Sequence, residues 1–262
     1  MICFSLVAHE NEEAVCQQVE NIRRFIKEDY MIVLYNGGFD KAFGHRVCER
    51  YVEVIMCLYN RPLQYRKTGR VLYDVSRWLK SMNIHYDYLV YLESDTMFIQ
   101  QGFGDFLNKA LRGHDFIGQH WSKYKPSEDK PRSPGTAMMF DDWERWKEYF
   151  QQNHFYKTSN PFQTYRYEII QKILEIVDGE KLEVLLAESP VESLGEMIFP
   201  TLAKKCGAKA KEYPKSFREF NRWKPGLRIN EVKRALESGG IIFLHPIKSS
   251  KTRDWIMDNV TQ

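Results

Sequence analysis

The chain has 262 residues, of which 43% are hydrophobic, and its 38 basic and 35 acidic residues leave a formal net charge of +3. A chain of this length can bury enough surface to fold without disulfides, and its balanced charge argues against nucleic acid as a partner. The five cysteines are scattered without a C-x-x-C pair, which excludes a regular disulfide framework or structural zinc site.

No apolar stretch approaches the roughly 20 residues that a membrane span requires, and residues 1–8 lack the basic start of a signal peptide. We therefore expect a cytoplasmic protein, and a peripheral contact with the inner face of a membrane stays open. No linker is visible, so we expect one α/β domain over residues 1–262. It divides into residues 1–120 and 121–262, which differ in the regularity of their patterns.

The first 120 residues alternate between strand and helix patterns. Continuous apolar runs predict buried strands at residues 2–8, 31–35, 52–58 and 88–92. Helical spacing follows Asn11, which is a suitable N-cap, and recurs over residues 71–82. This alternation predicts a mostly parallel sheet covered by helices.

The second half is less regular. We expect strands at residues 116–121, 136–140 and 241–244, and helices at 142–150, 165–177 and 194–206. The polar, proline-containing stretch 123–134 is typical of a mobile loop.

Polar side chains follow several of the predicted strands. His9, Asn36 and the segment Glu93-Ser94-Asp95 all stand at strand ends. Ligands of open parallel sheets bind beyond the carboxyl ends of the strands. These positions are therefore expected to meet in one cleft.

Glu93 and Asp95 flank a small residue directly after a buried strand. Residues at i and i+2 can both approach one ion when the chain turns at the strand end, and carboxylate oxygens suit a hard divalent cation. Such a cation would neutralise a leaving diphosphate, and Ser94 leaves room for a ribose. An acidic loop start is the simpler alternative.

At this point the sequence resembles the GT-A fold glycosyltransferases, whose signature is a DxD motif after a central strand. Glu93-Ser94-Asp95 is similar to that motif, with Glu in place of the first Asp. The resemblance implies a nucleotide-sugar donor, in first place a UDP-sugar, and Mn²⁺ or Mg²⁺ as cofactor. It makes Asp95 the first metal ligand, while Glu93 contacts either the ribose or the metal.

The C-terminal segment around His245 extends this resemblance. Many GT-A enzymes have a late histidine that completes the metal site and a nearby lysine on the diphosphate, which His245 and Lys248 resemble. The segment is also similar to core-2/I-branching N-acetylglucosaminyltransferases, some of which work without metal. In that case Lys248, Lys251 and Arg253 would supply the positive charge instead.

Glu192 and Glu196 are spaced i, i+4, so they would share one face of the expected helix. In the branching family an acidic residue precedes an aromatic residue and a Thr-Leu pair, and Glu196, Phe199 and Thr201-Leu202 resemble that pattern. The resemblance makes Glu196 the general base of an inverting transfer, with Glu192 as the second candidate. Acids that complement a helix dipole are the simpler explanation.

The segment 61–70 is basic and precedes a helix, where phosphate is attracted. The resemblance to GT-A enzymes implies that Arg66, Lys67 and Arg70 contact the nucleotide, together with Asn36 and His9; a solvated basic loop is the simpler alternative. The candidate platforms for an acceptor sugar are Trp121, Tyr124 and Trp223.

The resemblance thus predicts a glycosyltransferase that moves a hexosyl or N-acetylhexosaminyl group to a saccharide in polysaccharide or other glycan biosynthesis. Residues 1–120 would form its nucleotide-sugar-binding half, and residues 121–262 its acceptor-binding and catalytic half. A catalytically silent carbohydrate-binding or scaffold protein of the same fold is the alternative. A nucleotidyltransferase is disfavoured because residues 8–12 contain neither glycine nor a basic side chain.

Overall fold

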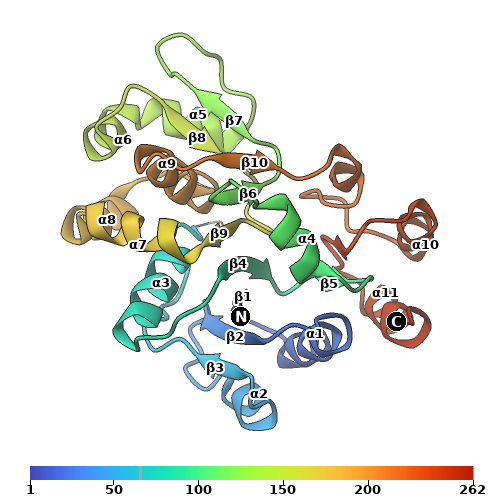
Figure 1. The fold of residues 1–262 in the computed structure, drawn as a ribbon. Coiled ribbons are helices and arrows are strands. Elements are labelled where there is room, and N and C mark those ends of the chain that lie inside the picture. Colours follow the sequence, from blue (N-terminus) through green and yellow to red (C-terminus); the bar gives the residue numbers. More distant parts are fainter. Residues whose placement is uncertain (65–66, 262) are drawn as a thin grey trace.

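The computed structural model describes residues 1–64 and 67–261 and shows an α/β protein built on a seven-stranded sheet (Figure 1). The strand order is β10-β6-β9-β4-β1-β2-β3. All neighbouring pairs are parallel except those of β9, which runs antiparallel to both β4 and β6. The strands are β1 Ile2–Ala8, β2 Tyr30–Asn36, β3 Val54–Met56, β4 Tyr88–Glu93, β6 Phe116–Gly118, β9 Thr164–Arg166 and β10 Ala210–Glu212.

The central strand β1 is apolar almost throughout because both of its faces are covered. Successive side chains of a strand point to opposite faces, so Phe4 and Leu6 enter one hydrophobic core and Cys3 and Val7 enter the other. The sheet therefore separates two cores, each closed by its own set of helices.

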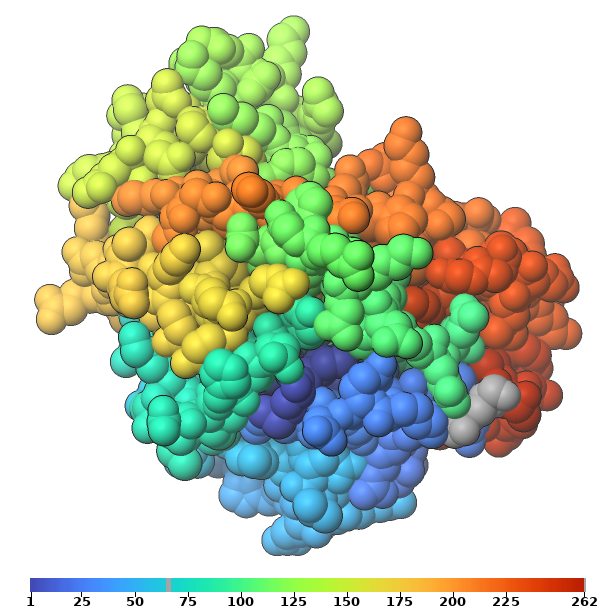
Figure 2. Space-filling view, in the orientation of Figure 1, coloured from blue at the N-terminus to red at the C-terminus, as the bar shows by residue number. Residues whose placement is uncertain are grey.

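The helices divide between the two cores. The first core is covered by α1 Glu12–Phe25, α2 His45–Arg50, α4 Phe103–Ala110, α10 Ile229–Ser238 and α11 Ser250–Asn259. The second is covered by α3 Val71–Ser81, α5 Pro134–Asp141, α6 Trp143–Phe150, α7 Tyr167–Ile176, α8 Gly179–Glu188 and α9 Ile198–Lys205. The C-terminal helices, red in Figure 2, lie beside the blue N-terminal part, where α11 packs on α1.

Two small sheets extend this framework. Strands β5 Met97–Phe98 and β11 Phe243–Leu244 pair antiparallel, and so do β7 Ser122–Tyr124 and β8 Phe155–Lys157. The chain also forms two short 3-10 helices within the described ranges, η1 Leu194–Glu196 and η2 Lys215–Glu219. The β5–β11 pair carries the last strand of the chain to the end of β4.

The expected strands of the first half are present, although β3 is shorter than residues 52–58. The expected strand at residues 136–140 is wrong, because this segment is part of helix α5. Ser133 accepts a hydrogen bond from the Thr136 backbone N–H, and Pro134 stands in the first turn of the helix. Proline at the first helical position after a serine N-cap favours a helix start.

Four further boundaries differ from expectation. The helix expected from residue 165 begins at Tyr167, since residues 164–166 form β9 between β4 and β6. The helix expected at 194–206 is divided into η1 and α9 at Met197. The strand expected at 116–121 ends at Gly118, and the expected loop 123–134 starts within β7. Within the described ranges, no helix has both the length and the apolar character needed to cross a membrane.

Candidate metal centre and adjoining cavity

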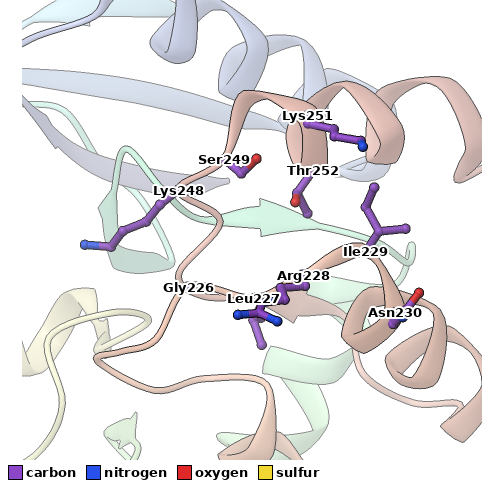
Figure 3. A pocket seen from close by; sticks show the side chains of 9 residues that line it. All are labelled: Gly226, Leu227, Arg228, Ile229, Asn230, Lys248, Ser249, Lys251 and Thr252. Atoms are coloured by element: carbon purple, nitrogen blue, oxygen red, sulfur yellow. The ribbon is translucent and has the colours of Figure 1, made fainter.

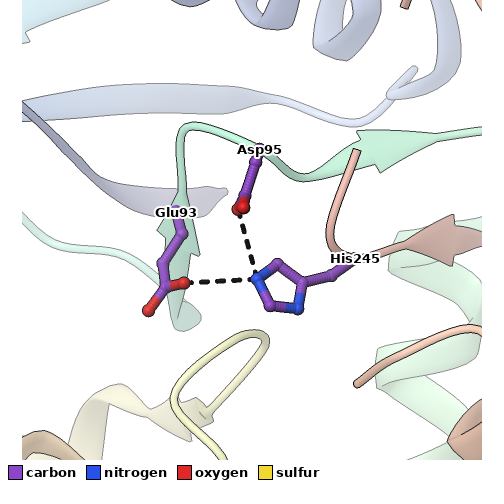
Figure 4. Close-up of side chains that lie close together, drawn as sticks. All are labelled: Glu93, Asp95 and His245. Atoms are coloured by element: carbon purple, nitrogen blue, oxygen red, sulfur yellow. Dashed lines mark hydrogen bonds and ion pairs between the residues drawn. The ribbon is translucent and has the colours of Figure 1, made fainter. Parts of the chain in front are cut away.

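Glu93, Asp95 and His245 meet at the carboxyl end of β4 (Figure 4). Glu93 is the last residue of β4, and His245 directly follows β11, 152 residues later in the chain. The Nε2 atom of His245 lies 3.2 Å from Oε2 of Glu93 and 3.2 Å from Oδ1 of Asp95. Pairing of β11 with β5 is what brings the imidazole to these two carboxylates.

The backbone of the acidic turn is held by donors from three other segments. Gln18 of α1 donates its side-chain amide to the Glu93 carbonyl at 2.9 Å. Arg253 of α11 donates to the Ser94 carbonyl at 2.6 Å, and the backbone N–H of Ile247 donates to the Asp95 carbonyl at 2.6 Å. The carboxylates therefore project from a fixed turn, which is the support that metal ligands require.

The three side chains influence each other's ionisation. Burial by itself would raise the pKa of Asp95, but the hydrogen bond with His245 and the charges of His245, Lys248 and Arg253 lower it below its usual value. Burial by itself would lower the pKa of His245, but its hydrogen bonds with Asp95 and Glu93 raise it to about 9. Without a metal, the imidazole is therefore a cation between two carboxylates at neutral pH.

The donor set suits a divalent cation. A single N–H at Nε2 cannot donate well to two carboxylates at once, so its 3.2 Å contact leaves Oδ1 of Asp95 without a well-aligned hydrogen bond among the described residues. The adjacent ligand atoms of an octahedral site with bonds of about 2.2 Å are about 3.1 Å apart. The 3.2 Å separations of Nε2 from both carboxylate oxygens agree with this spacing.

A cavity of about 530 Å³ adjoins the triad and contains the side chains of Glu93 and His245 in its wall. Its volume lies within the range of small-molecule sites. The remaining lining residues are mostly of polar types: Thr68, Gln119, His120, Ser133, Pro134, Gly135, Lys157, Ser159, Asn160, Pro161, Glu192, Ser193, Glu196, Asn221, Arg222 and Trp223. Both candidate bases and Trp223 thus lie on the same cavity as the triad, whereas Trp121 and Tyr124 are not among its lining residues.

Glu196 stands at the end of η1 and pairs with Lys157 of β8, whose Nζ lies 2.6 Å from Oε2 of Glu196. The Thr158 backbone N–H also donates to the Glu196 carbonyl at 2.9 Å, which ties η1 to this strand. Burial raises the pKa of Glu196, and the Lys157 ammonium partly opposes that rise. The pair therefore places an ionisable carboxylate in the cavity wall with its charge supported from one side.

The basic segment 61–70 makes protein contacts. Arg61 and Arg70 both form ion pairs with Glu183 of α8, at 3.1 and 2.6 Å, and both face Asp74 of α3. Lys67 donates to the Ser189 carbonyl at 3.0 Å. In the structure these side chains join α3 to α8, and none of the three lines the cavity. Arg66 lies outside the described residues.

Asn36 and His9 are at the ends of their strands, as expected, but outside the cavity wall. The Asn36 side chain accepts from the Gly38 N–H and donates to the Asp40 carbonyl, both at 2.8 Å, so its amide orders the turn. His9 is exposed, 3.7 Å from Glu10. Ser94 contributes its carbonyl to Arg253.

The C-terminal cations take different positions. The ammonium of Lys248 lies 3.8 Å from Oδ2 of Asp95 and is exposed. Lys251 is exposed on α11. Arg253 is only 6% exposed, and its guanidinium donates hydrogen bonds to the backbone carbonyls of Ala14 and Ser94. Lys248 is therefore the cation nearest to the triad, whereas Arg253 supports the acidic turn from behind.

Most lining residues of the cavity were not anticipated from the sequence, and three of them bear on its chemistry. Lys157 stands in a three-residue strand with no pattern that would single it out. Gln119 and Asn221 are buried, and Nε2 of Gln119 and Oδ1 of Asn221 have no hydrogen-bond partner among the described residues. Only the folded chain brings these polar atoms to one cavity.

A comparison with protein-family models finds no match for this chain, and a comparison with curated proteins finds none either. A functional assignment therefore depends on the geometry of the site.

Proposed function

We propose that this protein is a GT-A type glycosyltransferase that moves a sugar from a nucleotide diphosphate donor, with UDP as the first candidate, to a saccharide acceptor. One observation carries the proposal: a Glu-Asp-His cluster lies at the carboxyl edge of a mostly parallel sheet, on a cavity that also holds the half-buried Glu196. A leaving-group site and a base site thus adjoin one another.

The leaving diphosphate requires positive charge. Asp95, Glu93 and His245 would hold a divalent cation, which supplies Lewis-acid stabilisation of the diphosphate when bound. A site that mixes carboxylates with imidazole suits Mn²⁺ better than Mg²⁺. Lys248 adds a cation 3.8 Å from Asp95, and in a metal-independent enzyme Lys248 and Lys251 would carry this task.

Glu196 is the proposed base. Its ionised carboxylate would accept the proton of the acceptor hydroxyl as that oxygen attacks the anomeric carbon, and the diphosphate would leave from the opposite face, so the configuration inverts. Lys157 holds one carboxylate oxygen at 2.6 Å and stabilises the ionised form. Trp223, which is 60% exposed at the cavity wall, offers its ring to a pyranose.

The alternative is a carbohydrate-binding protein without activity. It is favoured by the same ion pair, because Lys157 occupies one oxygen of Glu196 and opposes the rise in its pKa that burial causes. The two functions differ in one result, since only an enzyme releases nucleoside diphosphate from its donor.

The test is calorimetric titration of UDP into the protein with MnCl₂ and again with EDTA, followed by an assay of UDP release from UDP-sugars with saccharide acceptors. Binding only with MnCl₂, together with release, supports the metal-dependent enzyme. Binding in EDTA transfers the diphosphate role to the lysines. Binding without release under any donor and acceptor favours the silent protein, and failure to bind UDP or other nucleotides rejects the nucleotide-sugar site.

A further inference from the structure

A second cavity of about 500 Å³ lies where α10 and α11 begin (Figure 3). It has no lining residue in common with the cavity beside the triad. Lys248 lines this second cavity, and its ammonium lies 3.8 Å from Oδ2 of Asp95 in the triad. The lining residues are Gly226, Leu227, Arg228, Ile229, Asn230, Lys248, Ser249, Lys251 and Thr252.

Both helices direct their N-terminal turns at this cavity. Ser249, the N-cap of α11, provides no side-chain cap, and its carbonyl accepts only from the N–H groups of Thr252 and Arg253. The N–H groups of Ser250 and Lys251 make no backbone hydrogen bond among the described residues. Unpaired N–H groups and the positive end of the helix dipole favour an anion.

The side chain of Thr252 gives an independent indication of a ligand. Thr252 is only 4% exposed, and its hydroxyl forms no hydrogen bond with any described residue. Figure 3 shows its oxygen turned into the space between α11 and the segment 226–229. The residue is buried while its hydroxyl oxygen opens into the cavity without a protein partner, so a polar occupant of the cavity can supply the missing hydrogen bond.

The charged side chains that line the second cavity are all positive. Arg228 and Lys251 form no ion pair with the described residues, and the lining residues include no carboxylate. The Arg228 backbone N–H is capped by Glu231 at 3.0 Å, but its guanidinium is not engaged by that contact. The cavity therefore presents N–H and O–H donors and cations to whatever enters it.

We propose that this cavity binds a phosphate group at a site separate from the triad. An ionised phosphate carries several acceptor oxygens and matches a wall of backbone N–H groups, a hydroxyl, a guanidinium and an ammonium. The volume admits the phosphate together with part of the molecule that bears it. This inference does not depend on the proposed glycosyl transfer.

The test is calorimetric titration of inorganic phosphate into the full chain at low ionic strength in EDTA. We expect saturable binding to one site, and the double variant Arg228→Gln/Lys251→Gln should weaken it about tenfold or more. The matched control Arg112→Gln/Lys211→Gln removes the same two charges from exposed positions outside both cavities and should bind as the wild type does. Thr252→Val, which keeps the side-chain shape, should weaken binding about threefold.

Absence of saturable binding, or equal weakening in the control, would overturn the proposal. So would displacement of phosphate by UDP and MnCl₂ with an equal loss of UDP affinity in Arg228→Gln, because the cavity would then belong to the triad. Undiminished UDP binding in Arg228→Gln, which keeps Lys251 in place, supports two sites. Two further probes then distinguish the source of the phosphate. Glucose 1-phosphate represents a soluble phosphate ester, and phosphatidylcholine vesicles that contain phosphatidic acid represent a membrane headgroup. Binding of either probe supports the phosphate site.

Discussion

The ammonium of Lys157 lies 2.6 Å from Oε2 of Glu196, in the wall of the cavity that also holds Glu93 and His245. The lysine comes from a short strand and the glutamate from a 3-10 turn. Burial favours the neutral carboxyl of Glu196, and the lysine opposes that effect. The balance between the two decides at which pH the carboxylate can accept a proton.

Replacing Glu196 by Gln should lower the rate of sugar transfer by about 10²–10⁴-fold, because general base catalysis contributes that much. Glu192→Gln, on the same cavity, should have a much smaller effect, and Glu188→Gln, outside the cavity wall, should have none. The measurement is kcat for UDP release at saturating acceptor. A larger loss in Glu192→Gln than in Glu196→Gln would assign the base to Glu192.

The pH profile of kcat/KM should show that activity falls as pH drops through the pKa of Glu196, because only the ionised carboxylate accepts a proton. Burial places that pKa above the usual range of a glutamate. Lys157→Met removes the opposing positive charge, so the acidic limb should move to higher pH. Lys157→Arg should restore the original profile. If the acidic limb of the kcat/KM profile does not move in Lys157→Met, the ion pair between Lys157 and Glu196 has only a structural role.

Replacing Asp95 by Asn should lower Mn²⁺ affinity by at least about 10–100-fold, since even the loss of an outer-shell partner has that effect. Asp105→Asn on α4 is the matched control, because Asp105 is exposed and distant in the fold from the triad. Both affinities are measured by calorimetry with MnCl₂. Equal Mn²⁺ binding in the wild type and Asp95→Asn would reject the metal centre.

In EDTA, the stability of the protein should decrease between pH 6.5 and about 9. The pKa of His245 is about 9 in the folded protein, against 6.5 for a free histidine. Its contribution is therefore complete below pH 6.5 and is lost as the pH rises through 9. The loss is on the order of 3 kcal/mol.

Chemical denaturation across this pH range should show the decrease in the wild type, and His245→Gln should show a smaller one. Parallel curves for the two proteins would contradict the raised pKa of His245.

Arg253→Gln should destabilise the protein by about 1.5–3 kcal/mol, the contribution of hydrogen bonds to a charged group. It should also weaken Mn²⁺ binding, because the Arg253 guanidinium holds the Ser94 carbonyl between the two acidic ligands. Thermal unfolding and calorimetry measure the two effects. Weakened UDP binding with unchanged stability and Mn²⁺ affinity would instead support a direct contact of Arg253 with the diphosphate.

The local sequence determined the framework of the fold and the acidic half of the candidate site. Apolar runs for doubly buried strands and helical spacing between them are properties of short segments, so they predicted β1, β2, β4, α1 and α3. Glu93 and Asp95 are covalently attached to the end of β4, and their position at the sheet edge followed directly. The helix α5 was missed because four apolar residues outweighed the Ser133-Pro134 start signal.

Only the tertiary structure decided which distant side chains complete the site. A resemblance proposed His245, but the pairing of β11 with β5 is what brings its imidazole to within 3.2 Å of Asp95. The same folding engaged Arg61 and Arg70 with Glu183, and it placed Lys157 on Glu196. Local patterns report which face of an element is buried, whereas the partner of a charged side chain depends on how those elements pack.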